Sequence, residues 1–235
     1  NRIRLIKVMN GNPLPLPMEK TDKIWQDSEI SDVGLFSEMK WFANNSTIFT
    51  GGLRYDLVKS NINDPEADFA QMYELEKRTE HNISGNLSVK KIVSPNFTIE
   101  AAYGRGVRSA NMIERFINHF TIGQDPYEYI GNPELKAEVN NQFEIGFKGF
   151  EPLSNSTKFS YATSFFFSTF ENYIVGIVDE TIGRKFMSPF EHAKVFRNLD
   201  EAYKTGFEMM GKLDFLNSFY LKTEFAYLYA KNRSD

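Results

Sequence analysis

The sequence contains no cysteine, no long hydrophobic run and no excess of positive charge. Without cysteine, its 235 residues can form no disulfide framework, no thiolate metal site and no cysteine nucleophile. The densest apolar stretches, 164–170 and 173–178, are far shorter than the ~18 residues of a membrane-spanning helix. The 31 acidic and 27 basic residues give a net charge of −4, which argues against a nucleic-acid partner.

Patterns typical of catalysis and of metal binding are also missing. The three histidines, His81, His119 and His192, are scattered without the spacing of a zinc site. No nucleophile, base and acid occur in a recognisable arrangement, and no pair of carboxylates differs from the general distribution of charge. The sequence therefore predicts no enzyme, no metal site and no cofactor.

What the sequence does contain is aromatic residues in alternation with polar ones. Phe, Tyr and Trp make up 15% of the chain, and apolar and polar residues alternate with the period of two of a β-strand. Arg2–Met9 is a candidate ninth strand, clipped at its start. Eight segments follow the alternation fully: 32–43, 49–57, 82–90, 97–104, 142–148, 159–168, 207–214 and 219–229.

Short and long connections between these segments alternate strictly. Short turns are expected at 44–45, 94–96, 152–156 and 217–218, and long polar links at 10–31, 59–80, 109–139 and 179–203. A chain that runs up and down a wall, with tight turns on one side and large loops on the other, gives this pattern. We therefore predict an all-β, antiparallel up-and-down meander of about eight or nine strands.

The apolar face favours a membrane wall. It is rich in Phe and Tyr, and aromatic residues such as Trp41, Tyr55 and Tyr103 lie toward strand ends, as in the aromatic girdles of outer-membrane barrels. The same alternation also fits two alternatives. One is a passive, porin-like channel, and the other is a soluble β-sandwich binding module with many Phe residues on its buried face.

Four stretches carry short motifs in a defined order. Residues 33–38 with 50–56 are similar to a strand pair ending in G-x-R-Y-D, and 101–108 is similar to a Y-G-x-G-F-R strand with Val107 in place of Phe. The stretch 131–138 followed by 141–146 resembles G-N-P-x-L-K-x-E…Q-x-E-x-G and is the most specific, and Thr205–Glu208 resembles a later G-x-E strand opening. In these motifs the chain resembles TonB-dependent outer-membrane receptors of the ferric-siderophore-receptor type, and the resemblance spans roughly residues 30–230.

This resemblance implies a 22-stranded barrel in the bacterial outer membrane, in contact with lipid and filled by an N-terminal plug domain. Such receptors take up scarce nutrients, most often ferric siderophores or other metal complexes, with energy from TonB acting on a segment before the plug. By comparison with this family, we expect the plug and the final strand to lie outside this chain. We therefore expect residues 1–235 to be part of a receptor barrel, and TonB to act through a segment absent from this chain.

Candidate ligand-binding residues lie on the polar face and in one long loop. Arg54 projects to the polar face two residues from Asp56, either to guide a ligand or to form ion pairs within the wall. Arg108 lies on the same face, where its strand enters the loop 109–139.

That loop contains a predicted short helix. Asn111 followed by Glu114 resembles a helix N-cap, and apolar residues follow at helical spacing, which places Arg115 and His119 four residues apart on the helix. Tyr127 and Tyr129 come next. Arginine and aromatic side chains suit an anionic metal chelate, because they offer charge-assisted hydrogen bonds and flat apolar contact. The alternative is a helix that only packs over the barrel mouth.

A partial barrel has two unpaired edge strands and a bare apolar face. We therefore expect this chain, studied alone, to self-associate edge to edge or face to face.

Overall fold

The computed structural model describes residues 2–9, 12–186, 188–216 and 218–233. The strands are β1 (Arg2–Met9), β2 (Asn12–Asp22), β3 (Asp27–Asn44), β4 (Thr47–Asp64), β5 (Arg78–Ser94), β6 (Phe97–Arg108), β7 (Tyr129–Ile130), β8 (Glu138–Ser154), β9 (Thr157–Gly183), β10 (His192–Phe215) and β11 (Phe219–Asn232). The helices are α1 (Ala67–Ala70) and α2 (Met112–Phe116). Neither is long and apolar enough to cross a membrane.

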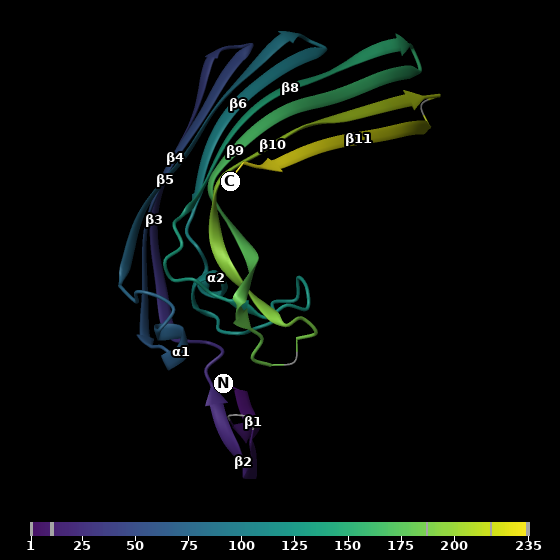
Figure 1. Cartoon of the computed structure of the whole chain (residues 1–235). Coiled ribbons are helices and arrows are strands. Elements are labelled where there is room, and N and C mark those ends of the chain that lie inside the picture. The colour runs from purple at the N-terminus through teal and green to yellow at the C-terminus, as the bar shows by residue number, and fades with distance from the viewer. Residues whose placement is uncertain (1, 10–11, 187, 217, 234–235) are drawn as a thin grey trace.

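Eight strands form one curved antiparallel sheet in the order β3-β4-β5-β6-β8-β9-β10-β11 (Figure 1). The two-residue β7 pairs with β10 in parallel, beside this path. The predicted antiparallel meander of eight or nine strands is thus confirmed. Within the described ranges no second sheet packs face to face on it, so the architecture is not that of a β-sandwich.

Three of the predicted short turns, at 44–45, 94–96 and 152–156, are confirmed, and the fourth, at 217–218, falls between β10 and β11 and includes residue 217, which lies outside the described residues. They join β3 to β4, β5 to β6, β8 to β9 and β10 to β11, and all lie at one end of the sheet, with the long connections at the other (Figure 1). We call these the short-turn end and the loop end. β4 pairs with β5 in continuous register, and β5 pairs with β6 with one register shift, between Ile92 and Ser94 beside the short turn.

The predicted long links are partly wrong, because several strands continue past the alternating segments. β9 and β10 are 27 and 24 residues long, so the link expected over 179–203 is reduced to 184–191. The link expected over 10–31 contains β2 and the start of β3. The extensions pack against loops rather than presenting one face to an apolar environment, so their sequences need not alternate.

Arg2–Met9 forms a strand, as expected, but it does not join the wall. β1 pairs with β2 in a separate two-stranded sheet. Figure 1 shows this hairpin beyond the loop end of the large sheet.

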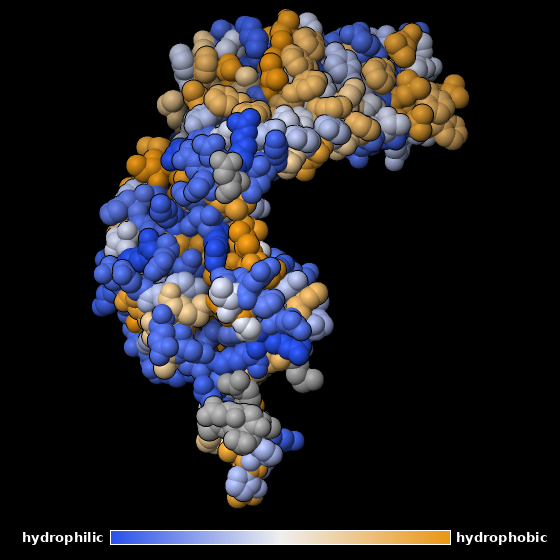
Figure 2. Space-filling view, viewed as in Figure 1, coloured by the Kyte–Doolittle hydropathy of each residue, from blue (hydrophilic) through white to orange (hydrophobic). Residues whose placement is uncertain are grey.

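The large sheet has two chemically different faces. The apolar face is open along its length, with Leu35 76%, Leu53 63% and Phe143 60% exposed. Figure 2 shows hydrophobic side chains gathered over the short-turn end and hydrophilic ones over the loop end. The polar face becomes buried near the loops, where Asp56 and Asn82 retain little exposed surface.

The buried hydrophobic residues gather at the loop end, where the loops pack on the extensions of the strands. One cluster contains Ala110, Ile117, Tyr129, Leu135, Ile174 and Phe196. A second contains Phe69, Ile130, Ala193 and Val195. Burial of apolar surface therefore stabilises the loop end, at roughly 25 cal/mol per Å² removed from water, whereas the short-turn end leaves its apolar face uncovered.

Candidate functional site

Four segments pack together at the loop end, and we call them the loop cluster: residues 22–26, 65–77, 109–137 and 184–191, the last without residue 187, which lies outside the described residues. Backbone bonds join two of them directly. Asn118 N donates to Ile24 O at 2.8 Å, and Trp25 forms an isolated β-bridge with Ile117. Long connections of this kind are commonly functional when they carry structure of their own.

The predicted helix start is confirmed at α2. The Asn111 side chain accepts a hydrogen bond from Glu114 N at 3.0 Å, and the Glu114 carboxylate accepts one from Asn111 N at 2.8 Å, which completes a capping box. The prediction that Arg115 and His119 share this helix is wrong. α2 ends at Phe116, because Ile117 adopts an extended conformation and enters the β-bridge with Trp25.

Arg115 is fully buried at the base of the loop cluster. Its Nη2 donates to both carboxylate oxygens of Glu80 at 2.9 Å, its Nη1 to Pro133 O at 2.9 Å, and its Nε to Ala110 O at 3.2 Å. Burial lowers the pKa of Arg115, and the charge of Glu80 opposes that effect. The guanidinium therefore joins α2, β5 and the 131–138 segment, and it offers no exposed surface to a ligand.

Lys185 connects three further parts of the cluster. Its Nζ lies 3.2 Å from Asp22 Oδ1, 3.1 Å from Glu66 Oε1 and 2.6 Å from Asp68 Oδ2. Burial alone would lower the pKa of Lys185, but the hydrogen bonds to these carboxylates outweigh burial and raise it. The lysine thus fastens the 184–191 loop to the end of β2 and to the segment around α1.

His119 and Glu128 form a second buried pair. His119 Nδ1 lies 2.9 Å from Glu128 Oε2, and the carboxylate also accepts the backbone N–H groups of Lys185 at 2.7 Å and Phe186 at 2.8 Å. Burial would raise the pKa of Glu128, but these hydrogen bonds hold it below its usual value. A carboxylate with three donors is satisfied, so the pair anchors the 109–137 segment against the 184–191 loop.

Tyr127 and Tyr129 flank the ammonium group of Lys194. Lys194 Nζ lies 4.6 Å from the Tyr127 ring centroid and 2.5 Å from Asp125 Oδ2, and Tyr129 Oη donates to the same carboxylate at 2.9 Å. Tyr127 stacks on Phe190 with centroids 3.8 Å apart. Tyr129 is buried, whereas the Tyr127–Phe190 pair reaches the surface.

The backbone of β9 leaves room for the Tyr129 ring at one position. A Cβ atom on Gly176 would lie 2.4 Å from Tyr129 Cε1, closer than real Cβ contacts allow. The ring therefore packs directly on the strand backbone, beside Phe196 at a centroid distance of 5.4 Å.

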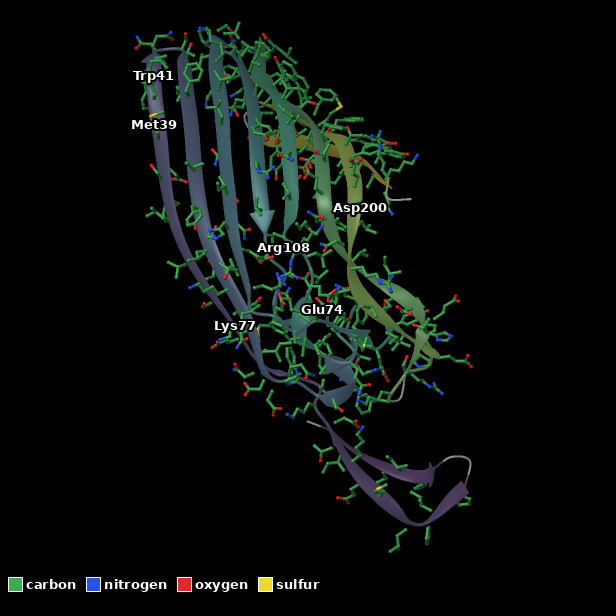
Figure 3. All side chains as sticks on the ribbon, turned by 60° about the vertical axis from the view of Figure 1, so that its left-hand side comes forward. Met39, Trp41, Glu74, Lys77, Arg108 and Asp200 are labelled. Atoms are coloured by element: carbon green, nitrogen blue, oxygen red, sulfur yellow. The ribbon has the colours of Figure 1, made fainter. Side chains whose placement is uncertain are left out.

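Arg54 and Arg108 lie on the polar face below the loop cluster. Arg54 forms a bidentate pair with Asp56, with Nε to Oδ2 at 2.8 Å and Nη2 to Oδ1 at 2.6 Å. Arg108 donates to Glu114 at 2.7 Å and to Glu138 at 3.2 Å, and Figure 3 shows it where the wall meets the loop cluster. Both arginines line one cavity of about 410 Å³, together with residues of β3, β5 and α2.

Other charges on the polar face also pair within the wall. Glu100 contacts Lys148 at 2.7 Å and Lys90 at 3.5 Å, across neighbouring strands. These wall charges, and Arg54 with Asp56, thus form ion pairs within the sheet, while a ligand role for Arg54 stays a prediction. Among the described residues, no cluster of three or more potential metal ligands occurs.

The structure thus separates the six predicted site residues into two groups. Arg54 and Arg108 share the cavity on the polar face. Arg115, His119, Tyr127 and Tyr129 belong to the loop cluster. Sequence reasoning missed Lys185 and Glu128, whose partners lie far away along the chain, so no local pattern could have identified them.

The TonB dependent receptor-like, beta-barrel family model matches residues 9–235. The chain belongs to this family. TonB-dependent receptors are outer-membrane transporters of Gram-negative bacteria and not enzymes, which agrees with the prediction of no enzymatic activity. None of the curated proteins matches the chain in sequence.

Solved structures of TonB-dependent receptors share the fold. The hemophore receptor HasR of Serratia marcescens, solved with its hemophore HasA and heme, is 18% identical with a TM-score of 0.68 over 92% of this chain and 37% of that chain. The copper transporter OprC is 18% identical with a TM-score of 0.66 over 88% of this chain and 29% of its own. The ferric enterobactin receptor PfeA, in complex with BCV-L6, is 18% identical with a TM-score of 0.58 over 93% and 28%.

This TonB-dependent receptor chain therefore spans about a third of the length of these structures. At 18% sequence identity, the comparison with these structures shows a shared fold and nothing further.

Proposed function

We propose that this chain forms one side of the barrel, with its loops, of a receptor that imports a metal chelate across a bacterial outer membrane. The observation that carries the proposal is the two-faced wall within a TonB-dependent receptor match over residues 9–235. Its apolar face, with Leu35, Leu53 and Phe143 exposed, suits a lipid bilayer, and its polar face suits a water-filled passage. The complete barrel has 22 strands and an internal plug coupled to TonB.

The ligand class follows from the accessible polar groups. Arg54 and Arg108 keep about half of their side chains exposed, 51% and 46%, in the cavity below the loops. Tyr127 supplies a stacked aromatic surface at the loop end. Cationic and aromatic groups along one route suit an anionic chelate, such as a ferric siderophore. Arg115, His119 and Tyr129 act by holding the loops that present these groups.

The test is energy-dependent uptake by cells that carry the complete gene. Cells with the gene and cells with a deletion are compared for accumulation of radiolabelled iron from a panel of ferric siderophores, with and without a protonophore. We expect uptake that needs the gene and stops when the protonophore collapses the proton gradient. Uptake that needs the gene but continues with the protonophore would favour the passive channel, and recovery of the protein outside the outer-membrane fraction would contradict the proposal.

Site variants then test the ligand route. Arg108→Gln and Tyr127→Ala should lower uptake or binding by about tenfold each, the loss expected for one charge-assisted bond or one aromatic contact. Glu29→Gln, an exposed change on β3, is the matched control and should leave uptake unchanged. Wild-type uptake in both site variants would remove these two residues from the proposed route.

A further inference from the structure

The apolar face contains a hollow at a position where a large side chain would have made the wall continuous. A smooth wall would carry large side chains in every row, but Ala101 on β6 lies between Val89 on β5 and Ile145 on β8 in the sheet register. The small side chain leaves an open hollow of about 680 Å³. This volume is within the range of roughly 300–1,000 Å³ of small-molecule sites.

The walls of the hollow are mainly apolar, with Ser88, Glu144 and Thr205 also in the lining. Leu87, Tyr103, Phe143, Phe165 and Phe167 surround Ala101 and line the hollow. The Phe143 ring contacts Tyr103 at a centroid distance of 4.7 Å, yet Phe143 is 60% and Leu87 59% exposed, so more than half of each residue is left uncovered by the described chain. Such a surface suits a flexible alkyl chain, which gains by leaving water and needs no hydrogen bond.

One positive charge lies at the loop-end rim of the hollow. Arg105 is exposed and follows Tyr103 by two residues on the same face of β6. Its Nη1 donates to Asn141 Oδ1 at 3.2 Å, and Tyr103 Oη donates to the same oxygen at 2.9 Å. Among the described residues no carboxylate lies within ion-pair distance of Arg105, unlike Arg54, Arg108 and Arg115. Arg105 and Tyr103 thus share one amide oxygen of Asn141, and a guanidinium has five N–H donors, so donors of Arg105 remain for another group.

From this juxtaposition we propose a docking site for a phosphate-bearing membrane lipid, with an acyl chain in the hollow around Ala101 and the phosphate on Arg105. The inference rests on the proposed function, which places the apolar face in a membrane. It goes further by assigning a phosphate-bearing lipid to one place on that face. Arginine suits this role because its planar fork can donate two bonds to one phosphate. The lipid belongs to the leaflet nearer the loop end, because Arg105 lies on that side of the hollow.

Native mass spectrometry of the complete protein, extracted from membranes in detergent, tests the site. The probe is phosphatidylglycerol, and diacylglycerol with the same acyl chains is the uncharged comparison. Arg105→Gln should weaken retention of phosphatidylglycerol by about tenfold, the loss expected for a bond to a charged group, and should leave diacylglycerol retention unchanged. Ala101→Trp fills the hollow and should reduce retention of both lipids.

Matched controls lie on the same face outside the hollow. Lys91→Gln removes a charge near the short-turn end, where Lys91 contacts Ser46 and Thr47, and Ile99→Trp adds bulk two residues from Ala101. Neither should change lipid retention. If Ala101→Trp fails to fold, Ala101→Leu replaces it, and Arg105→Gln still tests the headgroup contact.

Two results would overturn the lipid site. One is equal phosphatidylglycerol retention by wild type, Arg105→Gln and the Ala101 variant, and the other is an equal loss in the controls. Either result in a protein that remains in the outer-membrane fraction and supports uptake would refute the lipid site and leave the proposed receptor function standing.

Discussion

Arg115 on α2 and Glu80 on β5 form a bidentate ion pair, with Nη2 at 2.9 Å from both carboxylate oxygens. The arginine side chain is fully buried and the glutamate side chain is 14% exposed. The pair joins the longest described loop segment to the wall. A charge buried this completely is tolerated only with its partner in place.

Removing the partner of this arginine should therefore destabilise the loop cluster. Glu80→Gln leaves the buried guanidinium uncompensated, and we expect a loss of about 3–5 kcal/mol in the free energy of unfolding. Thermal unfolding and limited proteolysis of the 109–137 segment measure the effect. Glu29→Gln removes an exposed carboxylate from β3 and should change neither. Wild-type protease resistance in Glu80→Gln would show that the pair does not hold the loop.

The contact between Gly176 and Tyr129 makes a second prediction. Gly176→Ala should push the Tyr129 ring from its place on β9 and cost roughly 1–3 kcal/mol, as overpacking does. Gly183→Ala on the same strand is the control, because its Cβ would meet only Glu191 O at an ordinary 3.8 Å. Hydrogen exchange at residues 125–130 should rise in the first variant only. Equal exchange in both would contradict the packing argument.

The loop cluster should loosen as the pH falls. Burial alone would raise the pKa values of Asp68 and Glu128, but hydrogen bonds from Lys185 and His119 respectively, among others, hold them below their usual range. Depressed carboxyl pKa values in the folded state stabilise it above the unfolded pKa values of about 4, and this stabilisation disappears as the pH falls through the folded values. Protease sensitivity of residues 65–77 and 184–191 should therefore rise in acid.

At high pH, deprotonation of Lys185 should also destabilise the loop cluster. Its pKa is raised in the folded state, so its stabilisation is complete below the unfolded value of about 10.4 and is lost as the pH rises through the folded one. Lys185→Gln should weaken the cluster at neutral pH and remove the alkaline step. Lys91→Gln, at the short-turn end, should keep both. An unchanged pH profile in Lys185→Gln would contradict the proposed ion cluster.

The wall could be predicted from the sequence because its pattern is local. Alternation with a period of two assigns faces without knowledge of neighbouring strands, and turn residues such as Asn44 and Pro95 mark where strands reverse. The capping box at Asn111 and Glu114 is equally local, since both members lie within one turn. These features were confirmed by β3 to β6, by β8 to β11 and by α2.

The loop cluster could not be predicted in this way, because its contacts join distant positions. Lys185 pairs with Asp68, 117 residues away, and Glu128 accepts the Lys185 N–H from 57 residues away. Tertiary packing also overrode local helical spacing at Ile117, where a β-bridge with Trp25 ends α2 before His119. Residues 179–183 and 192–203 read as a polar link, yet they pair as the extensions of β9 and β10.

The two edges of the sheet lead to the last prediction. Every residue of β11 is exposed, and so is most of β3, and each strand is paired on one side only among the described residues. Unpaired strand edges beside an open apolar face recruit other chains. The 235-residue chain alone, in buffer without detergent, should therefore sediment as oligomers whose size grows with protein concentration.

Two lysine substitutions separate the edge from the face. Phe225→Lys places a charge on the edge strand β11, and Leu87→Lys places one on the interior strand β5, at the same exposure of 59%. If edges pair, the first should reduce oligomer size much more than the second, because charges on edge strands oppose strand addition. Equal reductions would indicate association through the apolar face. A monodisperse monomer of the unsubstituted chain would contradict both routes, since it would mean that the open edges and the apolar face remain solvated.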